Sequence, residues 1–401
     1  MAKNFYRKVL KNGLTIIFEK RDIPVVSVAF AVRSGGINEV AEEKGISHYI
    51  EHLLYKGTKN RSVKQIAEEI EKNGGDLNGF TGEEITAFWC KMPSKHLNVA
   101  LSVLGDMVKN PLFDKEEMEK ERKVIFEEIK MRRDSPRVYV CDEIMNLMYK
   151  EPCGTNLIGT AKTMKSIDRK KILEKFEKVY QPNNMILCVV GDAELKEIVD
   201  FAEKNFGKEK GVVREIDVKL RNGEKTEKRK GIDQASLVFA YHVGLAGSKE
   251  SYVAFVLNTL MAGGMSSRLF SEIREKRNLA YAVKGELEIN KRFGYNFVYV
   301  GTSKEYVGEV KKLIVEEFDK VAADLGEEEL KQVKEQLIGN YQISLEDSQV
   351  QMLNLLGAEI AGNAEMFYEF EKRVAEVKLK DVKELAKKAK QKHSFFVLVP
   401  E

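Results

Sequence analysis

Proline and cysteine are scarce in this chain of 401 residues. With only 7 prolines, long disordered linkers are not expected. The four cysteines are Cys90, Cys141, Cys153 and Cys188. They are widely spaced and form no C-x-x-C pair, which argues against a zinc knuckle or a thioredoxin-type redox site. We therefore expect free thiols in a reducing compartment.

Long apolar runs and an excess of one charge are also lacking. The longest apolar stretch, Val25–Val32, is too short to span a bilayer, and no run of signal-peptide length follows the N-terminal residues. The net charge is +3, and basic residues are interleaved with acidic ones, so there is no electrostatic footprint for nucleic acid or a membrane surface. We expect a cytoplasmic protein without nucleic-acid or membrane partners.

Charged residues, in contrast, are abundant. They make up 32% of the chain, above the roughly 25% of a typical globular protein. The excess is in lysine and glutamate, which is typical of thermophile proteins with surface ion-pair networks. The composition therefore predicts heat adaptation, which a melting curve would test.

Strand-like and helix-like patterns run along the chain and restart after its midpoint. The strand-like run 27–31 resembles 236–242, and the helical pattern 42–56 resembles 250–262. This weak duplication, with a period of about 200 residues, predicts an α+β protein of two homologous mixed α/β domains built from layers. The predicted parts are an N-terminal domain at 1–218, a polar linker at 219–231 and a C-terminal domain at 232–401.

His48, Glu51 and His52 form a His-x-x-Glu-His pattern within a predicted helix. Residues four apart lie on one face, one turn apart, so the two imidazoles suit two corners of a tetrahedral zinc site. Zinc would lower the pKa of a bound water to roughly 7, and Glu51 lies close enough to act as general base on that water. The third protein ligand must come from elsewhere, because no other histidine lies nearby.

An exposed polar helix face is the alternative interpretation of this pattern. However, two of the chain's five histidines lie here, and apolar residues surround the polar group within the same helix. These apolar residues are Ile46, Tyr49, Ile50, Leu53 and Leu54. A polar triad in such a setting is costly unless a partner such as a metal ion satisfies it, which favours the metal site.

Together with further segments, this helix resembles the inverzincin zinc peptidases of the pitrilysin, insulysin and mitochondrial processing peptidase family. The similar segments are 45–58, 74–81, 110–113, 121–128 and 266–281. The resemblance covers nearly the whole chain. It implies the mitochondrial-processing-peptidase-like fold, one Zn²⁺ per chain and the dimeric clamshell of the short two-domain branch. A homodimer is expected, although a heterodimer with a degenerate partner stays open.

The resemblance also implies the third zinc ligand. In this family it is a glutamate about seventy-six residues after the second histidine, and Glu128 lies 76 residues after His52. This spacing selects Glu128 over Glu127, a choice that the glutamate-rich segment alone leaves open. Glu121 matches the family's supporting carboxylate. It precedes Glu128 by seven residues and shares its helix face, which fits a supporting role.

Two groups of residues are implied to contact a peptide substrate. The first matches the family's edge strand, which takes an extended peptide by β-augmentation; its members are Asn78, Gly79, Phe80 and Thr81. Gly79 departs from the family, which usually has alanine there. The second is Arg274 and Tyr281, which match a pair that hydrogen-bonds the substrate backbone and could stabilise an oxyanion. In the clamshell dimers this pair comes from the partner subunit.

The second copy of the pattern lacks the candidate ligands. The positions that correspond to the two histidines and the two glutamates hold Ala254, Leu257, Asn258 and Asn340. Loss of the ligands with retention of the pattern predicts a catalytic N-terminal domain and a ligand-less, substrate-binding C-terminal domain.

These observations predict a zinc metallo-endopeptidase that hydrolyses unfolded peptides in an enclosed dimer chamber. One alternative is a non-catalytic scaffold or assembly subunit of the same fold. Such proteins usually have broken motifs, whereas every motif residue is present here. A metal-dependent lyase with the same inverted motif is a further alternative, and the long second half of this chain argues against it.

Overall fold

The computed structural model describes residues 4–401, and its contacts divide the chain into two compact units. The first unit consists of the chain up to Ile129 together with 156–217 and 344–368. The second consists of 130–155, 218–343 and 369–401. Each unit therefore contains a segment from the opposite half of the sequence. The domains predicted from the sequence, 1–218 and 232–401, are consecutive and do not include this exchange.

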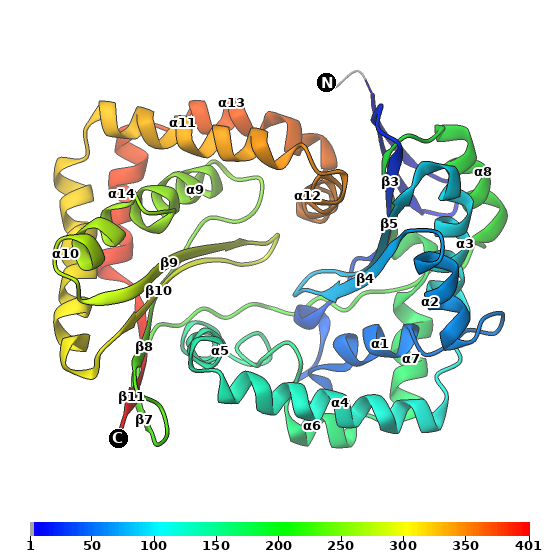
Figure 1. Cartoon of the computed structure of the whole chain (residues 1–401), viewed down its shortest axis with the longest axis horizontal. Helices are drawn as coiled ribbons and strands as arrows, with labels where there is room; N and C mark the ends of the chain where they lie inside the picture. The colour runs from blue at the N-terminus through cyan, green and yellow to red at the C-terminus, as the bar shows by residue number, and fades with distance from the viewer. Residues whose placement is uncertain (1–3) are drawn as a thin grey trace. The chain divides into compact units, whose positions relative to one another are not determined.

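A six-stranded mixed sheet forms the centre of the first unit, in the order β1-β2-β6-β3-β5-β4 (Figure 1). The strands are β1 (Phe5–Val9), β2 (Thr15–Lys20), β3 (Val25–Val32), β4 (Asp76–Thr81), β5 (Thr86–Pro93) and β6 (Met185–Gly191). Strands β2 and β6 pair in parallel, and the other neighbours are antiparallel. Because successive side chains of a strand point to opposite faces, β3 supplies residues to cores on both sides of the sheet.

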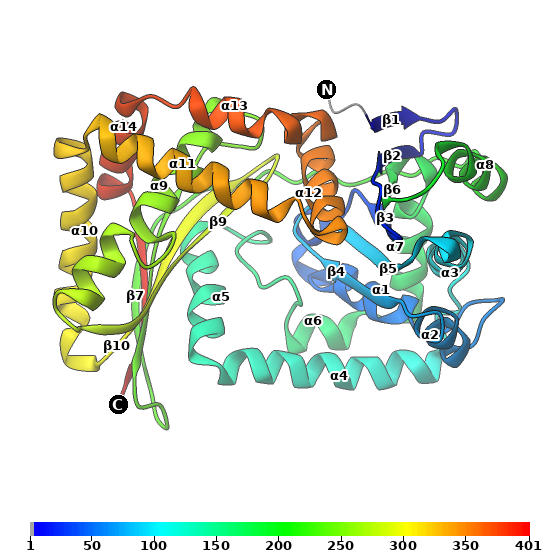
Figure 2. The ribbon, with the colours of Figure 1, turned by 45° about the horizontal axis from the view of Figure 1, so that its top comes forward.

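Seven helices of the first unit contribute to the core on one face of this sheet, where Val28 and Phe30 lie. These helices are α1 (Ile46–Leu54), α2 (Val63–Glu71), α3 (Leu97–Lys109), α4 (Lys115–Asp134), α6 (Ala161–Ser166), α7 (Arg169–Val179) and α8 (Leu195–Asn205). The opposite face, with Ala29 and Ala31, is covered by α12 (Ser348–Ala361). Figures 1 and 2 show α12 on the side of the sheet away from α3 and α8.

Helix α12 is joined to the sheet by a buried ion-pair cluster around Glu359. This carboxylate accepts two hydrogen bonds from Arg7, each of 2.8 Å, and one of 2.7 Å from Arg33. Burial acts to raise the pKa of the Glu359 carboxyl, but the hydrogen bonds from the two arginines outweigh it, and the pKa is lowered. The cluster thus holds a segment from the C-terminal half of the sequence against strands from the N-terminal half.

The second unit is built on a five-stranded sheet in the order β7-β11-β8-β10-β9. The strands are β7 (Glu224–Arg229), β8 (Ala235–His242), β9 (Ala280–Ile289), β10 (Gly294–Thr302) and β11 (Ser394–Pro400). Its core includes residues of α9 (Lys249–Ala262), α10 (Val307–Asp324), α11 (Glu327–Ser344), α13 (Phe370–Ala375) and α14 (Leu379–Gln391). Helix α5 (Pro136–Met148), from the N-terminal half of the sequence, packs against β8 and β11.

The range 219–231, expected as a linker, is part of this second sheet. Strand β7 lies within it and pairs in parallel with β11, from Glu224 opposite Phe395 to Arg229 opposite Pro400. The segment is highly charged because β7 is an edge strand whose side chains are largely exposed. A charged edge strand resists pairing with other chains, and from composition alone it resembles a loop.

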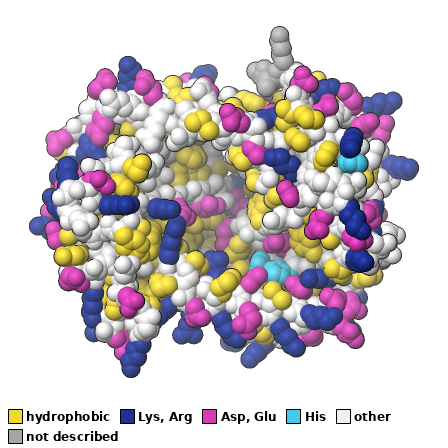
Figure 3. Space-filling model, in the orientation of Figure 1, with side chains coloured by type: hydrophobic (Ala, Val, Ile, Leu, Met, Phe, Trp, Pro, Cys, Tyr) yellow, Lys and Arg dark blue, Asp and Glu magenta, His cyan; other side chains and the backbone are white. Residues whose placement is uncertain are grey.

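The surface agrees with the balanced composition. On the face seen in Figure 3, side chains of both charges are interspersed, and neither sign forms a continuous field. Within residues 4–401, no helix combines the length and apolar character that a bilayer crossing requires.

Candidate metal centre

Helix α1 buries one side and leaves the motif residues on the other. Its residues Ile46, Tyr49, Ile50, Leu53 and Leu54 are each at most 1% exposed. They recur at helical spacing and form a continuous apolar stripe against the sheet. The three motif residues therefore lie together on the remaining face of the helix, where they are only partly buried.

The start of α1 is set by a buried carboxylate. Glu39 accepts hydrogen bonds from the backbone N–H groups of Gly45, at 2.9 Å, and Ser47, at 2.7 Å. Gly45 has φ of 96°, and a Cβ there would lie 2.6 Å from the carbonyl oxygen of Ile158, so only glycine fits. A carboxylate at a helix N-terminus is favourable for the helix dipole, and this one fixes where the motif begins.

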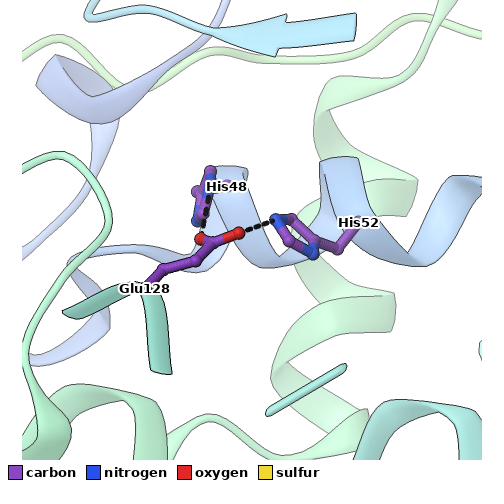
Figure 4. Close-up of side chains that lie close together, drawn as sticks. All are labelled: His48, His52 and Glu128. Carbon is purple, nitrogen blue, oxygen red and sulfur yellow. Dashed lines mark ion pairs between the residues drawn. The ribbon is translucent and has the colours of Figure 1, made fainter. Parts of the chain in front are cut away.

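Glu128 reaches both imidazoles from helix α4 (Figure 4). Its Oε2 lies 3.6 Å from Nε2 of His48, and its Oε1 lies 3.5 Å from Nε2 of His52. His48, His52 and Glu128 therefore form a group of three potential metal ligands. One ligand atom from each residue lies within 4.8 Å of the other two.

Helix α4 is fixed against α1 by contacts around Tyr49. The Tyr49 hydroxyl donates a hydrogen bond to the backbone carbonyl of Met118, and the Arg122 guanidinium lies 5.3 Å from the centre of the Tyr49 ring. The buried residues of α4 are Met118, Glu121 and Ile125, which recur at helical spacing on one side. The same side, one turn further, presents Glu128 to the histidines.

The chemistry of these donors fits zinc. Two imidazole nitrogens and one carboxylate are a known protein ligand set of catalytic zinc sites, which leave a fourth position open. The distances from Glu128 to the two histidines are longer than ordinary hydrogen bonds, so the three groups face one another without closing a direct hydrogen-bonded contact. Two nitrogens and a carboxylate that converge in this way fit a bound cation better than they fit a network of hydrogen bonds.

Glu121 orients His52 from the opposite side of the ring. Its Oε2 lies 3.0 Å from Nδ1 of His52, and its Oε1 lies 2.8 Å from Nζ of Lys56. Burial acts to raise the pKa of the Glu121 carboxyl, but the hydrogen bonds from Lys56 and His52 prevail and lower it. Because a carboxylate only accepts hydrogen bonds, Nδ1 of His52 is the donor in this contact, and Nε2 is the ring nitrogen on the side of Glu128.

Glu51 is partly buried, like the two histidines of the motif. Burial is the largest influence on its carboxyl and raises the pKa, although the hydrogen bond from Thr81 acts in the opposite direction. That bond runs from Oγ1 of Thr81 to Oε2 of Glu51 at 2.6 Å. Burial and the charge of Glu51 also raise the pKa values of Tyr55 and Tyr180 far above the ordinary range, so both phenols stay protonated. The glutamate is thus held by one directed hydrogen bond.

Strand β4 lies at the edge of the first sheet, and among residues 4–401 it pairs only with β5. Its residue Thr81 contacts Glu51, and Asn78 is exposed. Phe80 packs with the core on the α12 face of the sheet. The absence of a side chain at Gly79 has a steric reason, since a Cβ there would lie 2.5 Å from Oη of Tyr55. The strand expected to bind peptide is therefore an edge next to the candidate metal centre.

The corresponding helix of the second unit holds no ligand set. Ala254 and Leu257 are fully buried in α9, and the carbonyl oxygen of the Asn258 side chain accepts a 2.7 Å hydrogen bond from Asn296. Arg274 and Tyr281 belong to this unit. Arg274 is exposed, with its guanidinium 4.9 Å from the Phe270 ring centre.

Sequence reasoning did not identify two residues of this centre. Lys56, which pairs with Glu121, follows His52 by four residues, a helical spacing that could have indicated it. Tyr55 follows Glu51 by four residues, and its hydroxyl fills the space above Gly79. Glycine in place of the expected alanine was the available signal for Tyr55.

Comparison with known proteins shows which family the chain resembles. A family model described as insulinase (peptidase family M16) matches residues 15–161, and one described as peptidase M16 inactive domain matches residues 166–337. An uncharacterized zinc protease of Rickettsia felis is 32% identical over 355 residues, which cover 85% of this chain and 84% of that protein. The uncharacterized zinc protease YmxG of Bacillus subtilis is 32% identical over 351 residues, 86% of each chain.

Solved structures share the fold. The crystal structure of a protease from Helicobacter pylori matches with a TM-score of 0.91 over 99% of both chains, at 22% identity. The expected family and the expected mixed fold are therefore confirmed. With relatives named as zinc proteases at this level of identity, the chain belongs to peptidase family M16.

Proposed function

We propose that this protein is a zinc-dependent endopeptidase that hydrolyses unfolded peptides. The observation that carries the proposal is the convergence of the ligand atoms of His48, His52 and Glu128 within 4.8 Å, beside the carboxylate of Glu51. A purely structural ion-pair cluster does not require a further acid, here Glu51, beside it. A hydrolytic site does, because a base must take a proton from the attacking water.

His48, His52 and Glu128 would hold one zinc ion per chain. Bound there, zinc would supply Lewis-acid polarisation of a peptide carbonyl and lower the pKa of a water molecule. Glu121 keeps His52 in the tautomer whose Nε2 is free to bind a metal, and Lys56 keeps Glu121 ionised. Glu121 and Lys56 thus support the proposed ligand His52 without binding the metal themselves.

Glu51 acts as the general base in this proposal. As the water oxygen bonds to the carbonyl carbon, the carboxylate accepts a water proton, and it then returns that proton to the amide nitrogen as the C–N bond breaks. Thr81 holds Oε2 of Glu51 through its 2.6 Å hydrogen bond and limits the rotation of the carboxylate. Burial around Glu51 strengthens these electrostatic interactions by excluding water.

The substrate would bind as an additional strand along β4. Main-chain hydrogen bonds at a sheet edge recognise any extended peptide, which explains a preference for unfolded chains with little sequence selectivity. Asn78 is exposed on β4 and would contact a peptide bound there. Arg274 and Tyr281 would donate hydrogen bonds to the substrate from a second copy of the chain in an enclosing homodimer.

A non-catalytic scaffold subunit is the second candidate. It is favoured by the description of the second-half model as an inactive domain and by the lack of ligands in α9. Those features concern the second half alone, whereas the proposed ligands all lie in the first half. The two candidates differ in one measurable property, which is turnover of peptide.

The test uses a mixture of unstructured peptides, with products identified by mass spectrometry. The proposal expects cleavage by the purified protein, loss of cleavage after chelation and recovery when Zn²⁺ is added back. A protein that binds zinc and cleaves nothing would overturn it in favour of the scaffold.

A further inference from the structure

Tyr281 occupies an irregular position between strands β9 and β10. Gly301 pairs with Ala282, but the next residue, Thr302, pairs with Ala280, so Tyr281 is the extra residue of a β-bulge. Bulges re-aim a side chain relative to the regular pleat and are common beside functional sites. Tyr281 is 50% exposed, so one side of its ring remains accessible.

The ring of Tyr281 lies over a residue without a side chain. A Cβ built on Gly301 would lie 2.3 Å from Cζ and 2.4 Å from Oη of Tyr281. No side-chain carbon can approach an aromatic ring so closely, so any other residue at position 301 would displace the ring. The absence of a side chain at Gly301 therefore allows the Tyr281 ring to take the position that the bulge gives it.

A chain of hydroxyl groups ends at Tyr281. Oη of Tyr281 lies 3.4 Å from Oη of Tyr299, which lies 3.3 Å from Oγ of Ser236. Ser236 is 2% exposed, and the Arg137 guanidinium lies 5.3 Å from the Tyr299 ring centre. Burial raises the pKa of Tyr299 to about 12, so its phenol keeps its proton and can donate it.

We infer that Gly301, Tyr299 and Ser236 are positioning residues that hold the Tyr281 hydroxyl for hydrogen bonding to substrate, an inference that rests on the proposed peptidase function. The donors run from Ser236 to Tyr299 and from Tyr299 to Tyr281. In this direction the oxygen of Tyr281 accepts, and its own O–H is free to donate to a substrate carbonyl. Cooperative polarisation along the chain makes that last donor stronger.

A double-mutant cycle in the full-length protein tests the inference. Tyr281→Phe removes the final donor and should lower kcat by about 10²-fold, as for loss of one oxyanion donor. Tyr299→Phe should lower kcat about 5- to 10-fold with KM unchanged, because it weakens a donor used in the transition state. The double variant should be no slower than Tyr281→Phe alone. Additive losses would overturn the inference.

Two control variants measure the effect on kcat of losing a tyrosine hydroxyl, or of gaining a methyl group, elsewhere in the same unit. Tyr306→Phe removes another phenol hydroxyl of the same unit, and Gly308→Ala adds a methyl where nothing lies within 4 Å. Both should retain wild-type kcat, whereas Gly301→Ala should approach the kcat of Tyr281→Phe. If Gly301→Ala keeps the wild-type kcat, the role of Gly301 is contradicted.

Crystal structures of wild type and Gly301→Ala separate this inference from the proposed function. The inference expects the Tyr281 ring to lie over Gly301 in the wild type and to leave β10 in the variant. A ring that lies elsewhere in the wild type, or stays in place in the variant, would overturn it. This readout needs no turnover, so an inactive wild type would contradict the peptidase proposal without deciding the position of the ring.

Discussion

His52 contacts two carboxylates through its two ring nitrogens: Nδ1 lies 3.0 Å from Glu121, and Nε2 lies 3.5 Å from Glu128. The first contact holds the orientation of the ring, and the second places Nε2 beside Glu128, the third proposed ligand. Two acids on one helix thus have different tasks because they meet opposite sides of one imidazole.

Glu121→Gln should weaken zinc binding about 10- to 100-fold, the usual effect of losing a partner that orients a metal ligand. An amide can donate as well as accept, so it no longer enforces the proton on Nδ1 of His52. Competition with a chromogenic chelator measures the affinity. Glu116→Gln, an exposed change on the same helix, is the matched control. Equal zinc affinities for both variants would exclude an orienting role for Glu121.

Glu128→Gln and Glu127→Gln differ by one position and carry the same change of charge. Of these two glutamates, Glu128 is the one whose ligand atom converges with those of the histidines, whereas Glu127 is exposed. Zinc content measured by mass spectrometry after gel filtration should fall well below one per chain in Glu128→Gln and remain near one in Glu127→Gln. The reverse result would show that the ligand was assigned to the wrong glutamate.

Much of this centre could be predicted from sequence, and the reason is local geometry. His48, Glu51 and His52 lie within five residues of one helix, so their spacing alone predicts a shared face. Glu128 could not be chosen in this way, because α4 is rich in glutamate and its rotation depends on packing against Tyr49 and the rest of α1. Only the family spacing selected it.

The exchange of helices between the units was not predicted. Helix α5 packs on β8 and β11, and helix α12 packs on β3 and β6, each from the opposite half of the sequence. Apolar periodicity shows that a helix has a buried side, but not which sheet covers it. For the same reason, charged β7 appeared as a linker, since its pairing with β11 is a long-range contact.

Gly79→Ala should destabilise the fold by about 1–3 kcal/mol, because the new methyl would meet Oη of Tyr55 and the backbone oxygen of Ala87 at 2.8 Å. The Tyr55 hydroxyl has no hydrogen-bond partner among residues 4–401, so Tyr55→Phe alone should be neutral or stabilising by up to about 1 kcal/mol.

Combining Gly79→Ala with Tyr55→Phe should recover part of the lost stability. The hydroxyl oxygen of Tyr55 is then absent, while the clash with the backbone oxygen of Ala87 remains. Thermal melting of the two single variants and the double variant measures this. Gly357→Ala, where nothing lies within 4 Å, is the control. A melting temperature of Gly79→Ala equal to that of wild type would refute the steric account.

Glu359→Gln should destabilise the protein by about 2–4 kcal/mol at neutral pH, because it leaves two arginines around a buried neutral amide. The pKa of Glu359 is lowered in the folded state. Its stabilising contribution is therefore complete above the ordinary pKa of 4.5 and is lost as the pH falls through the lower folded value.

Denaturant unfolding at a series of pH values checks both statements. The difference between wild type and Glu359→Gln should be constant at neutral pH and shrink in acid, while Glu346→Gln, an exposed change just before α12, should show no such difference. A gap that widens in acid would contradict the assigned direction of the pKa shift.

The most direct test of the central claim measures zinc content and peptide cleavage in the same preparations of wild type and Glu51→Gln. The substitution preserves size and removes the base, and Glu51 is not among the three proposed ligands. The account predicts about one zinc per chain in both proteins and a rate of cleavage about 10²–10⁴-fold lower in Glu51→Gln. Full cleavage by zinc-loaded Glu51→Gln would contradict it, since the proton would then be taken by another group.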